Sequence, residues 1–224
     1  MKKYFTLIPI IAVLLIILAG CRTNIGTGSI TGTGPMVTRN IDVADFTALD
    51  ISGSHVVTFR QAPESALTIV MQENLFEHLN TNVRNNTLSI YSRRNFETTN
   101  ANRPRVYIYA PYLTALDISG AIAASDWDVI ETQSFSIDMS GAASINIDLN
   151  VDHLEIDASG AASITLRGIA NNLSIDGSGA LNISAGDLQI QSGSVDISGT
   201  ANVTLSTLEN VNVTTSGLAR VRAD

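Results

Sequence analysis

The chain has little of several residue types, and each shortage excludes something. It has a single cysteine, Cys21, so no disulfide can form within one chain. Lysine occurs only at Lys2 and Lys3. Aromatic residues make up 5% of the chain, whereas glycine occurs 16 times. That balance is typical of many short strands that meet at tight corners.

Positive charge is scarce beyond the first residues. From Cys21 onward the chain has 11 arginines, no lysine and 21 acidic residues, a net charge of −10. This balance argues against a nucleic-acid partner, because phosphate binding needs a concentrated basic surface. Residues 21–112 carry a net charge of +1 and residues 113–224 carry −11. An acidic body beside a near-neutral head favours a homo-oligomer through head-to-body contact; the alternative is a charged, solvated face that keeps the protein soluble.

The N-terminus combines a basic start with an apolar run from Phe5 to Leu18, followed directly by Leu18-Ala19-Gly20-Cys21. This order is that of a secretory signal peptide, and it resembles a bacterial lipobox. The resemblance implies a signal peptide over residues 1–20, cleavage before Cys21 and a lipid attached to Cys21. A membrane-spanning helix is the alternative, but the run is shorter than the ~20 residues a span needs and contains Pro9.

Residues 21–38 predict a flexible tether, because glycine alternates there with threonine and serine and few apolar residues are present. The tether would hold a globular body close to the membrane to which the lipid attaches. Arg22 follows the cysteine, where an acidic residue would resemble an inner-membrane retention signal. The predicted location is therefore the cell envelope, with the outer membrane favoured in a Gram-negative cell.

A six-residue phrase recurs through the second half of the chain. It reads Leu-Asp-Ile-Ser-Gly-Ala at residues 116–121 and returns with small changes at 137–142, 156–161, 175–180, 195–200 and 213–218. An early copy stands at 49–54. From Ser119 onward the serines are 21, 19, 19, 20 and 18 residues apart. A period of this size indicates stacked, equivalent units.

Each unit alternates apolar and polar residues, and the phrase ends at a glycine that suits a corner. The alternation predicts inward-facing columns, one of which contains Ile145, Ile164 and Ile183. No helical period separates the strands, so successive units are expected to stack in parallel. Together with the handedness of parallel crossovers, this predicts an all-β fold, a right-handed parallel β-helix with rungs of about 19–20 residues. It would occupy residues 39–224, irregular over 39–112 and regular over 113–224.

Two longer segments carry a family resemblance. Residues 43–53, Val-Ala-Asp-Phe-Thr-Ala-Leu-Asp-Ile-Ser-Gly, and residues 110–120, Ala-Pro-Tyr-Leu-Thr-Ala-Leu-Asp-Ile-Ser-Gly, resemble the head GIN domain family of auto-transporter adhesins. So do the later Ser-Gly-Ala phrases. The resemblance covers residue 39 to the C-terminus and implies a parallel β-helix in the cell envelope. Adhesion is the family's label, and the family carries no catalytic motif to transfer.

Arginines and tyrosines gather in the head, between two expected strands. The candidate glycan-binding residues are Tyr91, Arg93, Arg94, Arg103, Arg105 and Tyr107. Arginine can bind the carboxylate of a sugar acid through paired hydrogen bonds, and tyrosine can stack on a ring. The alternative is a solvated loop whose neighbouring tyrosines alternate in and out of a strand.

Aspartates recur on the outward side of the repeats. The candidate cation-binding column is Asp117, Asp138, Asp157, Asp176 and Asp196. Like charges about 4.8 Å apart repel by on the order of 0.9 kcal/mol per pair in water, so either hydrogen bonds or Ca²⁺ between rungs should offset the repulsion.

No pattern in the sequence predicts catalysis, a cofactor or a resident metal. The three histidines, His55, His78 and His153, have no metal-ligand spacing, and His55 is expected on a rung surface. Catalysis needs unlike groups that converge in a cleft, whereas these carboxylates repeat in similar surroundings. The sequence thus favours a non-catalytic binding, adhesion or structural surface, with glycan or a cell-surface protein as partner. The alternative is a polysaccharide-active enzyme that uses the Arg/Tyr cluster at 91–112.

Overall fold

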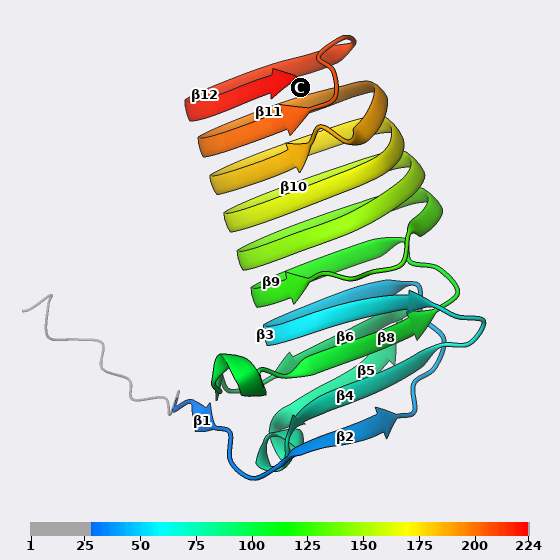
Figure 1. The fold of residues 1–224 in the computed structure, drawn as a ribbon, viewed down its shortest axis with the longest axis vertical. Helices are drawn as coiled ribbons and strands as arrows, with labels where there is room; N and C mark the ends of the chain where they lie inside the picture. The colour runs from blue at the N-terminus through cyan, green and yellow to red at the C-terminus, as the bar shows by residue number, and fades with distance from the viewer. Residues whose placement is uncertain (1–27, 224) are drawn as a thin grey trace, which may run out of the picture.

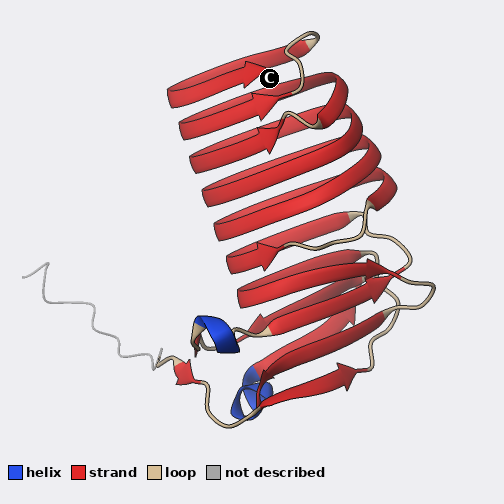
Figure 2. Cartoon of the chain, viewed as in Figure 1, coloured by secondary structure: helices blue, strands red, loops and turns tan. Residues whose placement is uncertain are grey.

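The computed structural model describes residues 28–223, and they are nearly all β-structure. The expected signal peptide, Cys21 and the first part of the expected tether lie outside the described residues. Twelve strands and two short 3₁₀ helices follow one another (Figures 1 and 2). In the first half they are β1 (Ile30–Thr31), β2 (Met36–Ile41), β3 (Ala48–Gln61), β4 (Ala66–Gln72), η1 (Glu73–His78), β5 (Leu79–Arg84), β6 (Thr87–Ser92), β7 (Phe96–Glu97), η2 (Asn100–Asn102) and β8 (Arg105–Ala110). In the second half they are β9 (Ala115–Ala124), β10 (Ile130–Ala185), β11 (Leu188–Leu205) and β12 (Val211–Ala223).

The second half of the chain winds upward as a stack of turns from β9 to β12 (Figure 1). Neighbouring strands pair in parallel with the repeated phrases in register: Ser119 pairs with Ser140, and Ser178 pairs with Ser198 and Ser198 with Ser216. The early phrase also joins the stack, because Ser52 of β3 pairs with Ser119 of β9. Units 67 residues apart in sequence are therefore direct neighbours in space.

The head differs from this regular pattern. β2 pairs antiparallel with β4, β4 with β8, and β5 with β6. The sheet is consequently mixed and open, and its order runs β12-β11-β10-β9-β3-β8-β4-β2. The coarse expectation of an all-β fold is confirmed. The expected parallel β-helix over residues 39–224, irregular over 39–112, does not extend through the head, because short hairpins such as β5–β6, with Asn85 and Asn86 at positive φ in the turn, allow strands to reverse direction.

The N-terminal segment also differs from the expectation. The expected tether extended to residue 38, yet strands begin at Ile30 and β2 pairs with β4 along its whole length. The pairing gives the backbone of residues 36–41 hydrogen-bond partners that a glycine-rich coil lacks. The chain is therefore already part of the head sheet by Met36.

The core is a set of apolar columns inside the stack. The expected inward residues Ile145, Ile164, Ile183 and Val203 are all buried, whereas Val221 of the last strand is half-buried. At the glycine corners the rungs approach so closely that a Cβ on Gly160, whose φ is +102°, would lie 2.4 Å from the Gly141 oxygen. Glycine is required there by both the backbone conformation and the space.

Candidate functional site

The ladder of strands is interrupted on one side of β3. Residues 48–51 pair with β6 and residues 56–61 pair with β8, so Ser52–His55 have no strand partner on the head side. On the opposite side the same four residues pair with β9. The chain between β6 and β8 instead loops outward through β7 and η2. This break leaves the first corner of the stack uncovered.

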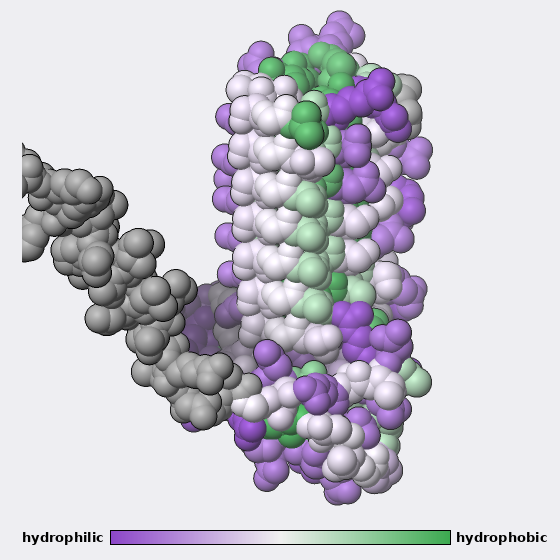
Figure 3. Space-filling model, turned by 90° about the vertical axis from the view of Figure 1, so that its left-hand side faces the viewer, coloured by the Kyte–Doolittle hydropathy of each residue, from purple (hydrophilic) through white to green (hydrophobic). Residues whose placement is uncertain are grey.

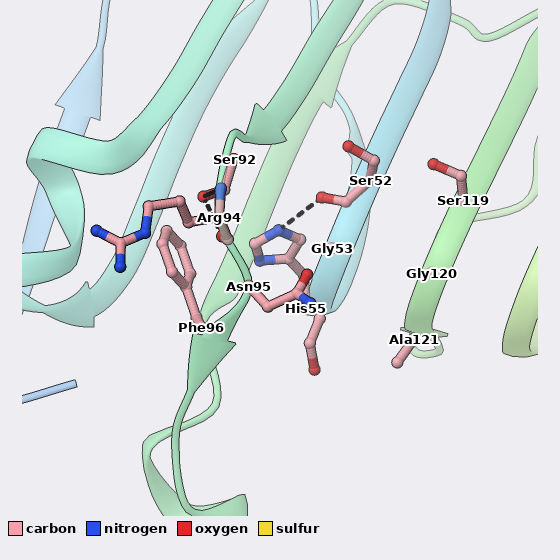
Figure 4. Close-up of a pocket in the computed structure, with 11 residues that line it drawn as sticks. Ser52, Gly53, His55, Ser92, Arg94, Asn95, Phe96, Ser119, Gly120 and Ala121 are labelled. Carbon is pink, nitrogen blue, oxygen red and sulfur yellow. Dashed lines mark hydrogen bonds between the residues drawn. The ribbon is translucent and has the colours of Figure 1, made fainter. Parts of the chain in front are cut away.

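A cavity of about 440 Å³ occupies the break (Figure 4). It is lined by Ser52–His55, Ser92, Arg94–Phe96 and Ser119–Ala121. A second recess of about 230 Å³ adjoins it, since Ser54 and Ala121 line both. Thr98, Thr99, Asn100 and Arg103 complete the recess. Serine, threonine and amide residues make up four of the six residues that line the recess and five of the eleven that line the cavity, and neither lining contains an aspartate or glutamate.

His55 forms the inner wall of this cavity and is 1% exposed, so the expectation of a surface histidine is wrong. Burial lowers the pKa of its imidazole to about 4, the hydrogen bond to Ser52 opposes that change, and the charge of Arg103 lowers the pKa further. Nε2 lies 3.1 Å from the Ser52 carbonyl oxygen, which can only accept a hydrogen bond. The neutral ring must therefore carry its proton on Nε2 and leave Nδ1 as an acceptor.

The burial of His55 had a signal in the sequence. His55 stands three residues after Ser52, and the equivalent position after later corner serines holds Ala143, Ala162 and Ala201, which are all buried. A histidine in an inward column is unusual, because burial without partners is unfavourable for a polar ring. Counting along the repeat would thus have predicted a buried histidine at the first corner.

Arg94, which lines the cavity, and Arg103, which lines the recess, make no ion pair with a described residue. Arg103 donates from Nη2 to the Ala121 carbonyl oxygen, which places its guanidinium where cavity and recess meet. Its Nε–H is buried and has no hydrogen-bond partner within residues 28–223. Arg94 donates from Nε to the Gly28 oxygen at 2.7 Å, and Figure 4 shows its guanidinium beyond the Phe96 ring, away from His55.

The structure separates the predicted Arg/Tyr cluster into several groups. Arg94 lines the cavity and Arg103 the recess, whereas Arg93 borders a different hollow beside Glu77 and His78. Arg105 and Tyr107 lie on the outward face of β8, which alternates with buried Val106 and Ile108, and Tyr91 is on β6. Of the six candidates, two border the break in the ladder.

The aspartates form a continuous outward column. Asp50 pairs with Asp117 and Asp117 with Asp138, and Asp176 pairs with Asp196. Partial burial raises the pKa of Asp117, and the charges of Asp50 and Asp138 raise it further. The pKa of Asp157 is raised in the same way, by desolvation first and then by Asp138, Asp176 and Glu155. No three metal-ligating side chains cluster within residues 28–223.

Small residues form a narrow face along the stack. The Ser-Gly-Ala corners lie in register from rung to rung, and Figure 3 shows pale and light-green columns running the length of the body between hydrophilic side chains. At the far end β12 has no strand beyond it among the described residues. Its Val213 is 42% exposed and its Leu218 is 81% exposed, whereas the equivalent Val195 one rung below Val213 is buried.

The fold and the cavity together define the class of protein, which is an elongated all-β protein with an open stack of strands and a polar hollow in its head. The particular family follows from its sequence model, described as "Putative auto-transporter adhesin, head GIN domain", which matches residues 45–223. The chain belongs to this family. No curated protein matches the chain. Among the described residues, no helix is both long and apolar enough to cross a membrane.

Solved structures share the fold. A crystal structure titled as an adhesin from Bacteroides fragilis has a TM-score of 0.78 at 17% identity, covering 88% of this chain and 100% of its own. A structure titled as a lipid-binding protein from Parabacteroides distasonis has a TM-score of 0.59 at 18% identity, covering 88% and 100%. An adhesin-titled structure from the same species has a TM-score of 0.57 at 20% identity, covering 88% and 98%. At these identities the likeness establishes the fold alone.

Proposed function

We propose that this protein is a lipid-anchored adhesin-type binding module of the cell envelope, without catalytic activity of its own. The observation that carries the proposal is the family match over residues 45–223, supported by the adhesin titles of structural neighbours. The sequence Leu18-Ala19-Gly20-Cys21 supports signal-peptide cleavage over residues 1–20 and lipid attachment at Cys21. In this proposal the stack from β9 to β12 is itself a right-handed parallel β-helix.

The position of the anchor gives the module an orientation. β1 lies at the head, at the opposite end of the molecule from β12 (Figure 1). Gly28 follows Cys21 by seven residue steps, which reach at most about 25 Å when extended. The head and its cavity would therefore face the layer next to the membrane, the outer membrane in a Gram-negative cell. The acidic stack would extend away from it, available to glycans or to cell-surface proteins.

Replacing the anchor residue tests the location. In cells that express the full chain, we expect the protein to incorporate labelled fatty acid and to sediment with the envelope. Cys21→Ser should remain soluble after cell lysis and incorporate no label, while Ser29→Ala, a change downstream of the anchor, should behave as the wild type. Envelope association of Cys21→Ser without a lipid would contradict the anchor.

A glycan array probed with the full chain tests the binding role. We expect retention on a subset of glycans and no change in the length of the bound chains. Absence of retention on every glycan, together with no retention on whole cells, would contradict an adhesin. Shortening of the glycans would identify an enzyme instead.

A further inference from the structure

Two buried nitrogen atoms at the break in the ladder have no partner within residues 28–223: His55 Nδ1 and Arg103 Nε. The two atoms need hydrogen-bond partners of opposite kinds. The Arg103 Nε–H can only donate, whereas His55 Nδ1 accepts because Nε2 is turned to the Ser52 carbonyl. Buried polar atoms in folded proteins nearly always have a partner, so each such atom needs an explanation. A ligand that satisfies both must offer an acceptor oxygen and a hydroxyl donor.

The charge of the residues that line the cavity and the recess indicates that the acceptor group of the ligand is negatively charged. Arg103 is held at the junction of cavity and recess by its bond to the Ala121 oxygen, and that bond uses one of its five N–H groups. Neither lining contains an acidic residue that could neutralise it. A planar guanidinium with several free N–H groups binds a carboxylate or a phosphate through two parallel hydrogen bonds. The acceptor is therefore best matched by an anionic group, and a sugar carboxylate carries such a group beside its hydroxyls.

The remaining walls are suited to hydroxyl groups. Ser52, Ser54 and Ser119 line the cavity, and Thr98 and Asn100 line the recess. Their side chains can both donate and accept, as a sugar hydroxyl does. The cavity volume of about 440 Å³ falls within the range of small-molecule sites. Figure 4 shows the His55 ring between the Ser52–Gly53 corner and the segment that carries Asn95 and Phe96.

We infer that the cavity and its adjoining recess together form a binding site for a carboxylated sugar, with the carboxylate on Arg103 of the recess and a sugar hydroxyl donating to His55 Nδ1 of the cavity. The inference rests on the proposed binding function and assigns it a place and a ligand class. Of the six residues predicted to bind glycan, it assigns the contact with the ligand to Arg103. Arg105 lies two residues away on the outward face of β8 and takes no part.

Isothermal titration of the full chain in detergent micelles tests this site with a trisaccharide of galacturonate, its neutral galactose counterpart, and inorganic phosphate. We expect the uronate to bind and the neutral sugar to bind at least ~10-fold more weakly, because it lacks a charge-assisted pair worth about one decade or more. Phosphate can form that pair but has no sugar hydroxyls for His55 Nδ1 and the serines, so it should also bind more weakly than the uronate. Arg103→Gln should weaken the uronate at least ~10-fold, and Arg103→Lys should fall between, since it keeps the charge but loses the fork.

Two further variants complete the design. Arg105→Gln removes the same charge nearby and should leave the affinity within about 2-fold of the wild type, as exposed charges contribute little. His55→Phe removes the acceptor and should reduce the preference for the uronate over a carboxylate without hydroxyls, such as acetate; its urea midpoint reports whether the head has folded. Equal losses for Arg103→Gln and Arg105→Gln, or phosphate that binds as tightly as the uronate, would overturn the inference. Retention of other glycans on the array without any uronate binding would overturn it too, while leaving the proposed binding function intact.

Discussion

The buried histidine makes the stability of the head depend on pH in a way that can be calculated. In the folded protein the pKa of His55 is lowered from 6.5 to about 4, chiefly by burial. A lowered histidine pKa means that the unfolded chain binds the proton more readily than the folded one. The stabilising contribution is therefore complete above about pH 6.5 and is lost as the pH falls through about 4.

The size of the pKa change of His55 sets how much unfolding free energy is lost. A difference of 2.5 pH units between the two states corresponds to about 3 kcal/mol of unfolding free energy. His55→Gln removes the titration but keeps an Nε2–H that can donate to the Ser52 carbonyl. Relative to this variant, the wild type should lose about 3 kcal/mol between about pH 7.5 and about pH 4.

Urea unfolding followed by the fluorescence of Trp127 measures this difference. Trp127 is the one tryptophan of the chain, donates from its indole nitrogen to the Val57 oxygen and packs on Phe59 with ring centroids 5.7 Å apart. It therefore reports on the part of β3 that follows His55. Because both proteins share the aspartate column, its own titration cancels in the comparison.

The matched control is His153→Gln, which changes an exposed histidine on the stack. Because this side chain is exposed, the variant should unfold within about 0.5 kcal/mol of the wild type. A gap between wild type and His55→Gln that stays constant from about pH 7.5 to about pH 4 would refute the reasoning, because it would mean that the folded state does not resist protonation of His55.

Three other outcomes are expected, each measured by urea or thermal unfolding. Gly160→Ala should destabilise the stack by more than ~3 kcal/mol, because it combines a positive φ with a Cβ 2.4 Å from a backbone oxygen; Gly34→Ala, with a positive φ but open space, should cost less than half as much. Ile164→Asp buries an unpaired charge and should leave little folded protein, whereas Ser163→Asp on the exposed side of the same strand should fold; equal stability of the two would contradict the inward assignment. Asp157→Asn should stabilise the protein at neutral pH and lose that advantage in acid, because desolvation first and the neighbouring charges second raise the folded-state pKa of Asp157 and make its ionised form unfavourable; an advantage that grows on acidification would contradict this account.

The aspartate column was predicted as a cation site or as a hydrogen-bonded ladder. Ser89 donates to Asp50 at 3.1 Å, but Asp50 lies one rung before the five predicted aspartates, so the hydrogen-bonded ladder stays a prediction for them. Desolvation raises the pKa of Asp117 and of Asp157, and the charges of neighbouring aspartates in the column raise both further. Calcium binding stays a prediction, and it is tested by thermal unfolding with and without added Ca²⁺.

The sequence by itself determined the stacked half of the protein. Ile145, Ile164 and Ile183 are buried where their period of two places them, and the corner glycines stack in register because each repeat finds an equivalent neighbour about 19 residues away. In such an array the surroundings of a residue are copies of its own unit, so local pattern and tertiary contact carry the same information.

Only the tertiary structure decided the head and its cavity. The partner of β3 changes from β6 to β8 within one strand, and the four residues between them, which pair only with β9, border the hollow beside His55. Arg103 reaches this hollow while Arg105 does not, although they are two residues apart. These outcomes depend on pairing between segments that are tens of residues apart and have no repeated sequence. No local period therefore predicts which of these segments will pair.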